Sequence, residues 1–153
     1  MGCDIHLYVE TRTAQGWKSI DAWSREEGEP RDVAHEDRFY TGRNYSLFEM
    51  LANVRGAGLL PPISEPKGLP DDVSAEVRGT SDAWGCDGHS HSFLTLRELS
   101  GYDWGAATSP EMPWARTRGE AAGDFYIKTM PRLRALSGDG AGDDVRIVFF
   151  FDN

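Results

Sequence analysis

Cysteine is scarce in this sequence, and long hydrophobic runs are missing altogether. The 153 residues include only Cys3 and Cys86, which is too few for a disulfide framework and leaves no Cys-x-x-Cys zinc pair. No apolar stretch approaches the roughly 18 residues that a membrane-spanning helix needs. We therefore expect a cytoplasmic protein with reduced thiols and no membrane association.

Positive charge is also in short supply. Sixteen Lys and Arg stand against 25 Asp and Glu, which gives a formal net charge of −9. A chain of this sign is unsuited to non-specific binding of a nucleic-acid backbone. The 17 Gly and 8 Pro favour long irregular loops, whereas five Trp, five Tyr and seven Phe can supply much of a core. The length fits a single domain spanning residues 1–153.

Both ends of the chain have the alternating pattern of β-strands. Residues 3–10 alternate strictly between apolar and polar side chains, and residues 17–20 read as a short partner strand. Residues 144–152 are rich in Val, Ile and Phe and are apolar on both faces, which favours a central strand. We predict that the two ends pair in an antiparallel sheet, which would bring Asp152 beside Asp4 and His6.

Short helices and long loops are expected between these ends. Asn44 is a plausible N-cap for a helix whose apolar residues recur at helical spacing, and Thr95 and Glu98 fit a capping box. Further helical turns are expected at residues 71–77, at 120–128 and from Pro131. Irregular segments are predicted at 24–44, 59–72 and 101–118. The predicted fold class is α+β, a small sheet with helices on one face.

The segment Asp87-Gly-His-Ser-His-Ser92 carries the most distinctive chemistry. In an extended chain, His89 and His91 project to the same side about 6–7 Å apart, so that both could bind one metal ion. His6 would add a third imidazole, while Asp4 and Asp87 would complete the ligand set and act as catalytic residues. Zinc, or another divalent metal, is the expected cofactor because imidazole predominates. The alternative is that these polar tracts only form turns and caps.

Other residues are typical of an anion-binding pocket. Arg43, Asn44 and Tyr45 precede a predicted helix, where a guanidinium and backbone N–H groups can hold an anion. The alternative for this tripeptide is a helix cap together with a hydrophobic staple. Glu65 and Lys67 belong to a proline-rich loop of the kind that can wall a pocket. With Asp152, these residues are the predicted ligand contacts.

Five motifs together resemble a family of small bacteriophage and prophage proteins that begin Met-Gly-Cys-Asp-Ile-His. In this chain the motifs are Met-Gly-Cys-Asp-Ile-His at 1–6, Arg-Asn-Tyr at 43–45, Pro-Ile-Ser-Glu-Pro-Lys-Gly-Leu-Pro at 62–70, Asp-Gly-His-Ser-His-Ser at 87–92 and Phe-Asp-Asn at 151–153. The resemblance implies a phage protein in a bacterial cytoplasm. Small acidic phage proteins often act against host defences, so an anti-defence role is expected by association. The resemblance implies no particular reaction.

Two functions therefore compete. The first is metal-assisted hydrolysis of a small phosphorylated or nucleotide-like molecule, with His6, His89 and His91 as ligands. The second is a non-catalytic binder that sequesters a host defence signal or a host protein through the same polar residues. A purely structural role for the histidines is a third reading.

Overall fold

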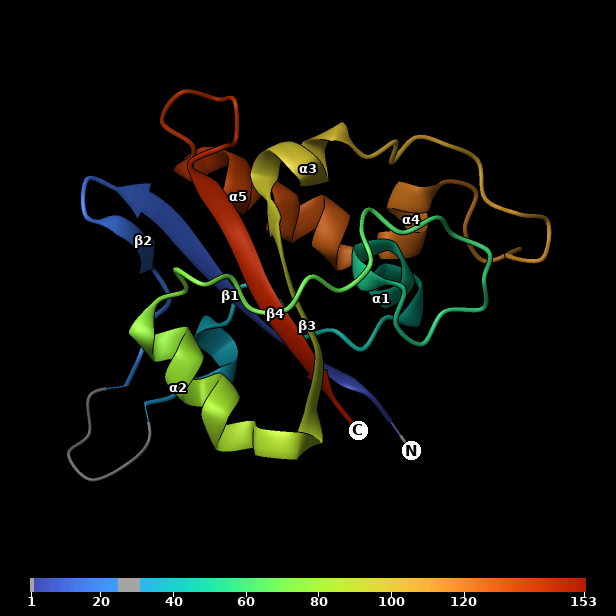
Figure 1. The fold of residues 1–153 in the computed structure, drawn as a ribbon. Helices are drawn as coiled ribbons and strands as arrows, with labels where there is room; N and C mark the ends of the chain where they lie inside the picture. The colour runs from blue at the N-terminus through green and yellow to red at the C-terminus, as the bar shows by residue number, and fades with distance from the viewer. Residues whose placement is uncertain (1, 25–30) are drawn as a thin grey trace.

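A four-stranded antiparallel sheet organises the computed structural model, which describes residues 2–24 and 31–153. The strands are β1 (Asp4–Thr13), β2 (Gly16–Ser19), β3 (Gly88–Thr95) and β4 (Val145–Asp152), in the order β2-β1-β4-β3 (Figure 1). The predicted α+β fold class is confirmed, as is the pairing of the two chain ends. Residues 25–30 of the predicted loop 24–44 lie outside the described residues.

Strand β4 is central because both of its faces are apolar. It pairs with β1 from Asp4↔Asp152 to Thr11↔Val145 and with β3 on its other side. Every residue of β4 except Asp152 is buried. This position agrees with the sequence prediction, since a strand that is apolar on both faces must be covered from both sides.

The first face of the sheet is covered by most of the helices. Helices α1 (Tyr45–Ala52), α4 (Arg118–Ala122) and α5 (Met130–Leu136) lie behind the sheet in Figure 1, and α3 (Leu96–Gly101) follows β3 directly. The η3 segment (Phe125–Thr129) is a π-helical turn that leads into α5. In α1, Leu47 and Leu51 are fully buried against Phe149 and Phe151 of the same core, as the helical spacing predicts.

Side-chain caps fix where two of these helices begin. The Asn44 side chain accepts a hydrogen bond from the Leu47 N–H, and Thr95 and Glu98 form a reciprocal capping box. Both caps were predicted from the sequence. They matter because α1 and α3 are too short to be stable as isolated helices and depend on caps and packing.

The second face of the sheet is covered by α2 (Ala75–Trp84), which lies in front of the sheet in Figure 1. Val77 packs there with Tyr8, Val148 and Phe150 in a smaller core cluster. The sequence predicted only one or two helical turns, ending at residue 77, and helices on one face. Helix α2 therefore adds a layer that the sequence prediction did not include. The short η2 turn (Gly85–Asp87) links it to β3, and η1 (His35–Asp37) belongs to the neighbouring loop.

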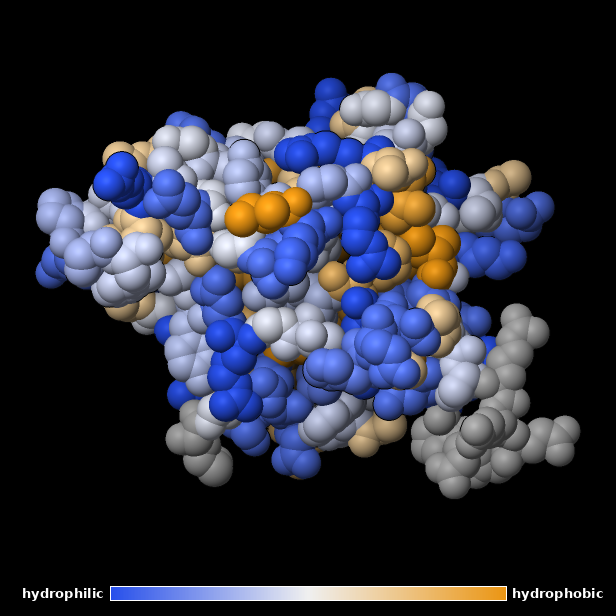
Figure 2. Space-filling model, turned by 180° about the vertical axis from the view of Figure 1, so that it is seen from behind, coloured by the Kyte–Doolittle hydropathy of each residue, from blue (hydrophilic) through white to orange (hydrophobic). Residues whose placement is uncertain are grey.

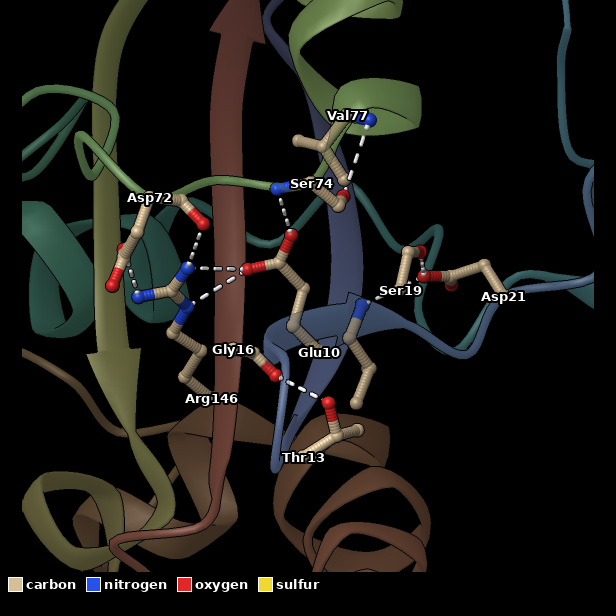
Figure 3. Close-up of polar contacts among 10 residues, drawn as sticks. Glu10, Thr13, Gly16, Ser19, Asp21, Asp72, Ser74, Val77 and Arg146 are labelled. Carbon is tan, nitrogen blue, oxygen red and sulfur yellow. Dashed lines mark hydrogen bonds and ion pairs between the residues drawn. The ribbon is translucent and has the colours of Figure 1, made fainter.

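A buried ion pair bridges β1 and β4 on this second face. Glu10 and Arg146 oppose each other in the strand register, and Glu10 Oε1 lies 2.7 Å from Arg146 Nη2 (Figure 3). Asp72 accepts a second hydrogen bond from the guanidinium, and Glu10 Oε2 accepts one from the Ser74 N–H at the start of α2. The pair therefore holds α2 to the sheet through fully satisfied polar groups.

The face of the molecule that is turned away from the viewer in Figure 1 is mainly polar. Seen from behind in Figure 2, hydrophilic residues cover most of the surface, and hydrophobic residues emerge in a few patches. Within the described residues, no helix combines the length and the apolar character needed to span a membrane.

Candidate functional site

The predicted polar residues gather at the end of the sheet where β1 begins and β4 ends. Asp152 stands opposite Asp4 on one side and Gly88 on the other. On the second face of the sheet, His6 Nε2 lies 2.6 Å from Asp152 Oδ2. The sequence prediction that strand pairing brings Asp152 beside Asp4 and His6 is thus confirmed.

This His6–Asp152 contact orients the imidazole. A carboxylate can only accept a hydrogen bond, so Nε2 is the donor and Nδ1 is the ring nitrogen that this contact leaves free. Nδ1 makes no hydrogen bond to any residue in the described part of the chain. His6 is 8% exposed, so its ring is almost enclosed while one nitrogen remains available for a ligand.

Aromatic rings line up across the strands around His6. The imidazole contacts Trp84 at a ring-centre distance of 4.5 Å and stacks on Phe150 at 4.9 Å. His91 stacks on Phe150 at 5.1 Å from the other side. Gly88 lies beside these residues, since a Cβ there would make ordinary contacts of 3.4 Å with both Phe150 and Trp84. His6 and His91 therefore share a face but are separated by a phenylalanine ring.

The prediction that His89 and His91 project to the same side is wrong. A β-bulge interrupts the pairing of β3 with β4 between His89 and Ser92, and Ser90 has a left-handed φ of 54°. His89 consequently stacks on Phe151, which belongs to the first face, and its Nε2 contacts Asn153 Oδ1 at 3.2 Å. One inserted residue reverses the alternation on which the prediction depended.

The bulge also separates the predicted metal ligands. Among the residues that the structure describes, no group of three or more His, Cys, Asp or Glu side chains is placed to hold a metal ion. His6 is engaged by Asp152, His89 faces the other side of the sheet, and burial together with the neighbouring His89 lowers the pKa of His91. A zinc site built jointly from His6, His89 and His91 is therefore not assembled in this arrangement.

A hollow of about 600 Å³ opens beside His6, and we call it the histidine hollow. Trp84 lines one wall with 38% of its surface exposed, and the predicted catalytic residue Asp87 lies next to it. Arg31 and Arg38 line the hollow from the loop that precedes α1. The remaining lining residues are Tyr8, Asp32, Thr80 and Ala83.

The hollow combines fixed and adjustable polar groups. Arg38 is anchored, because its Nε donates to the Val33 carbonyl oxygen at 3.0 Å and its Nη2 lies 3.3 Å from Asp32. Arg31 makes a long, exposed contact of 3.5 Å with Glu76, a kind of pair that contributes little and is easily exchanged for a ligand. Burial raises the pKa of Tyr8. The Tyr8 hydroxyl is therefore neutral at pH 7 and can hydrogen bond to a bound molecule.

The predicted anion contact at Arg43 is occupied by a carboxylate. Arg43 makes a two-pronged contact with Asp4, at 2.9 Å and 2.8 Å, and this hydrogen bonding lowers the pKa of Asp4. Asn44 caps α1, and the Tyr45 hydroxyl accepts a hydrogen bond from the Cys3 N–H. The structure thus gives Asn44 and Tyr45 the capping and packing roles that the sequence left open as the alternative.

The proline-rich loop runs along β3 and does not reach the histidine hollow. Its backbone is held by bonds from the Gly68 N–H to the His91 carbonyl oxygen and from the Lys67 N–H to Ser92 Oγ. The Lys67 ammonium lies 4.2 Å from the Phe93 ring centre and contacts Glu98, while Glu65 accepts a hydrogen bond from Asn53. In this arrangement Glu65 and Lys67 make contacts within the protein.

Sequence reasoning missed Trp84, Arg31 and Arg38. Trp84 carried a weak signal, since a large aromatic residue directly before Gly85 is expected at a helix end, where it can remain accessible. The two arginines lie in a polar stretch without any period, so only the folded chain places them beside His6.

Comparison with protein-family models, with curated proteins and with solved structures gives no match.

Proposed function

We propose that this protein binds a small phosphorylated, nucleotide-like molecule in the histidine hollow and retains it without needing to convert it. The observation that carries the proposal is the composition of the hollow. An accessible Trp84, two arginines and an oriented imidazole border one space of about 600 Å³, which lies within the usual size of small-molecule sites.

Each part of such a ligand has a matching group. A flat ring can stack on Trp84, which supports stacking of about 1–3 kcal/mol. Arg31 and Arg38 offer charge-assisted hydrogen bonds to a phosphate. Asp32 and Asp87 can accept hydrogen bonds from sugar hydroxyls or ring amines.

Hydrolysis of the same molecule is the second candidate, and the His6–Asp152 pair favours it. An imidazole oriented by a carboxylate at 2.6 Å can accept a proton from water. Metal assistance lacks an assembled ligand set among the described residues, so retention is better supported than hydrolysis. If the protein is encoded by a phage, retention would withhold a signalling molecule from the host. This biological role is supported by the family resemblance alone.

Titration with AMP, followed by calorimetry, tests the binding proposal. Trp84→Leu should weaken AMP binding roughly 5- to 150-fold, because stacking of about 1–3 kcal/mol is lost. Trp114→Leu is the matched control, since Trp114 is 69% exposed and lies outside the hollow. Equal affinities in both variants, or no saturable binding of AMP, ADP or ribose 5-phosphate by the native protein, would refute the proposal.

Product analysis separates retention from hydrolysis. The native protein without a histidine tag should return the nucleotide unchanged after incubation with and without added Zn²⁺ or Mn²⁺. Metal-dependent release of phosphate, abolished by His6→Gln, would establish hydrolysis as the function instead. Elemental analysis of the same preparation tests the predicted zinc directly.

A further inference from the structure

A second hollow also borders the chain segment that carries Arg38. It encloses about 560 Å³ between residues 38–44 and residues 124–132, and we call it the basic hollow. Four of its lining residues are cationic and one is acidic: Arg38, Arg43, Lys128, Arg132 and Asp124. Such a local excess of positive charge stands out in a chain with nine more acidic than basic residues.

The walls of the basic hollow are held in place by specific contacts. Thr129 Oγ1 donates to the Phe39 carbonyl oxygen at 3.1 Å, and Asn44 Nδ2 donates to the Ala121 carbonyl oxygen at 2.8 Å. The Tyr40 ring packs edge-on against Phe125 at 5.5 Å. These contacts tie the 38–44 segment to η3 and α4, so the space is formed before any ligand arrives.

Gly42 keeps the floor of the basic hollow close to Tyr40. A Cβ at this position would lie 2.4 Å from the Tyr40 hydroxyl oxygen, so a side chain there would displace the ring. Burial raises the pKa of Tyr40 to about 12. Its hydroxyl is consequently neutral and can donate a hydrogen bond to an anion.

Several of the cationic groups have hydrogen-bonding capacity to spare. Arg132 stacks over the Phe39 ring at 4.2 Å and forms no ion pair with any described residue. Lys128 and Asp124 are 3.4 Å apart and both about 70% exposed, a kind of pair that contributes little. Arg43 uses Nε and Nη2 on Asp4, which leaves Nη1. An anion entering the hollow would therefore gain partners without breaking a strong contact.

We propose that the basic hollow is a separate binding site for the phosphate groups of a small polyanion, of which inorganic pyrophosphate is the simplest probe. Arg132 and Lys128 would bind its oxygens from α5 and η3, and Arg38 and Arg43 from the facing segment. The site is independent of the histidine hollow except for Arg38, which lines both.

Calorimetric titration of the full chain with pyrophosphate at constant ionic strength tests this site. Arg132→Gln should weaken binding roughly 10- to 100-fold, the range expected when a charge-assisted hydrogen bond is lost. Lys128→Gln should weaken it in the same direction. Arg134→Gln is the matched control, because it removes the same charge from an exposed position on α5 that does not line the hollow.

The outcomes distinguish this site from the histidine hollow. Trp84→Leu should leave pyrophosphate binding unchanged even if it abolishes AMP binding, so each site can fail without the other. Equal weakening by Arg132→Gln and Arg134→Gln would mean general attraction to positive charge and would overturn the proposal. The absence of saturable pyrophosphate binding by the native protein would overturn it as well.

Discussion

Asp21 is a buried carboxyl group whose neutralisation should stabilise the protein. It is 8% exposed, and its Oδ2 accepts hydrogen bonds from the Val9 N–H and Ser19 Oγ. Within the described residues, Oδ1 is buried without a hydrogen-bond partner. Burial raises the pKa of Asp21 from 3.8 to about 6. Each pKa unit corresponds to about 1.4 kcal/mol, so ionised Asp21 costs the folded state about 3 kcal/mol above pH 6.

The sign of the pH dependence follows from this raised pKa. Between pH 4 and pH 6 the folded chain binds a proton at Asp21 that the unfolded chain has released, so stability decreases as the pH rises through this range. Asp21→Asn is always neutral and should remove that dependence. The new amide N–H₂ would occupy the place of the unpartnered Oδ1, which costs about 1–3 kcal/mol.

Urea unfolding at pH 7.5 and pH 4.5 measures the effect. The free energy gained by Asp21→Asn relative to the native protein should be about 2 kcal/mol greater at pH 7.5 than at pH 4.5. Asp144→Asn is the contrasting control, because hydrogen bonds from the Gly138 N–H and Ser137 lower the pKa of Asp144, so that this change should reduce stability at pH 7.5. A pH-independent effect of Asp21→Asn would show that Asp21 is already ionised at little cost.

Three further changes test the fold. Glu10→Gln should destabilise the protein by about 3 kcal/mol in urea unfolding, the lower end of the range for a broken buried pair, because Arg146 loses its fully buried carboxylate and keeps only the more exposed Asp72. A loss below about 1 kcal/mol, the range of exposed ion pairs, would contradict the burial of the pair. Leu51→Ala should lower the free energy of unfolding by about 2–5 kcal/mol, since Leu51 is fully buried beneath the sheet. A decrease of only about 0.5 kcal/mol, typical of surface positions, would place α1 outside the core. Ser90→Val should lower the thermal midpoint more than Ser90→Gly, because a β-branched residue is strained at a φ of 54°; equal midpoints would argue against the bulge.

The sheet could be predicted because its strands obey simple alternation. Residues 3–10 and 144–152 each present apolar side chains at every second position, and the apolar second face of β4 required a central place. The cap at Asn44 and the capping box at Thr95 depend on local residue types, so they too were visible in the sequence.

The candidate site could be predicted only in part. Asp152 was placed beside His6 because strand register follows from pairing, whereas the bulge at Ser90 depends on one left-handed residue that no hydrophobic pattern reveals. Trp84 and Arg38 reach the histidine hollow through tertiary packing of α2 and of a loop without periodicity. The alternating sequence pattern thus predicted which end of the sheet carries the polar residues. It did not predict the Trp84 and arginine side chains that line the histidine hollow beside that end.

The most direct test of the account is a two-dimensional ¹H–¹⁵N nuclear magnetic resonance titration of the native protein with AMP. We predict saturable shifts of the Trp84 indole N–H and of the backbone amides of Ala83, Tyr8 and His6, with little change at the Trp114 indole N–H. Shifts confined to residues outside the histidine hollow, or no shifts at millimolar AMP, would contradict the claim that this hollow binds nucleotide-like molecules.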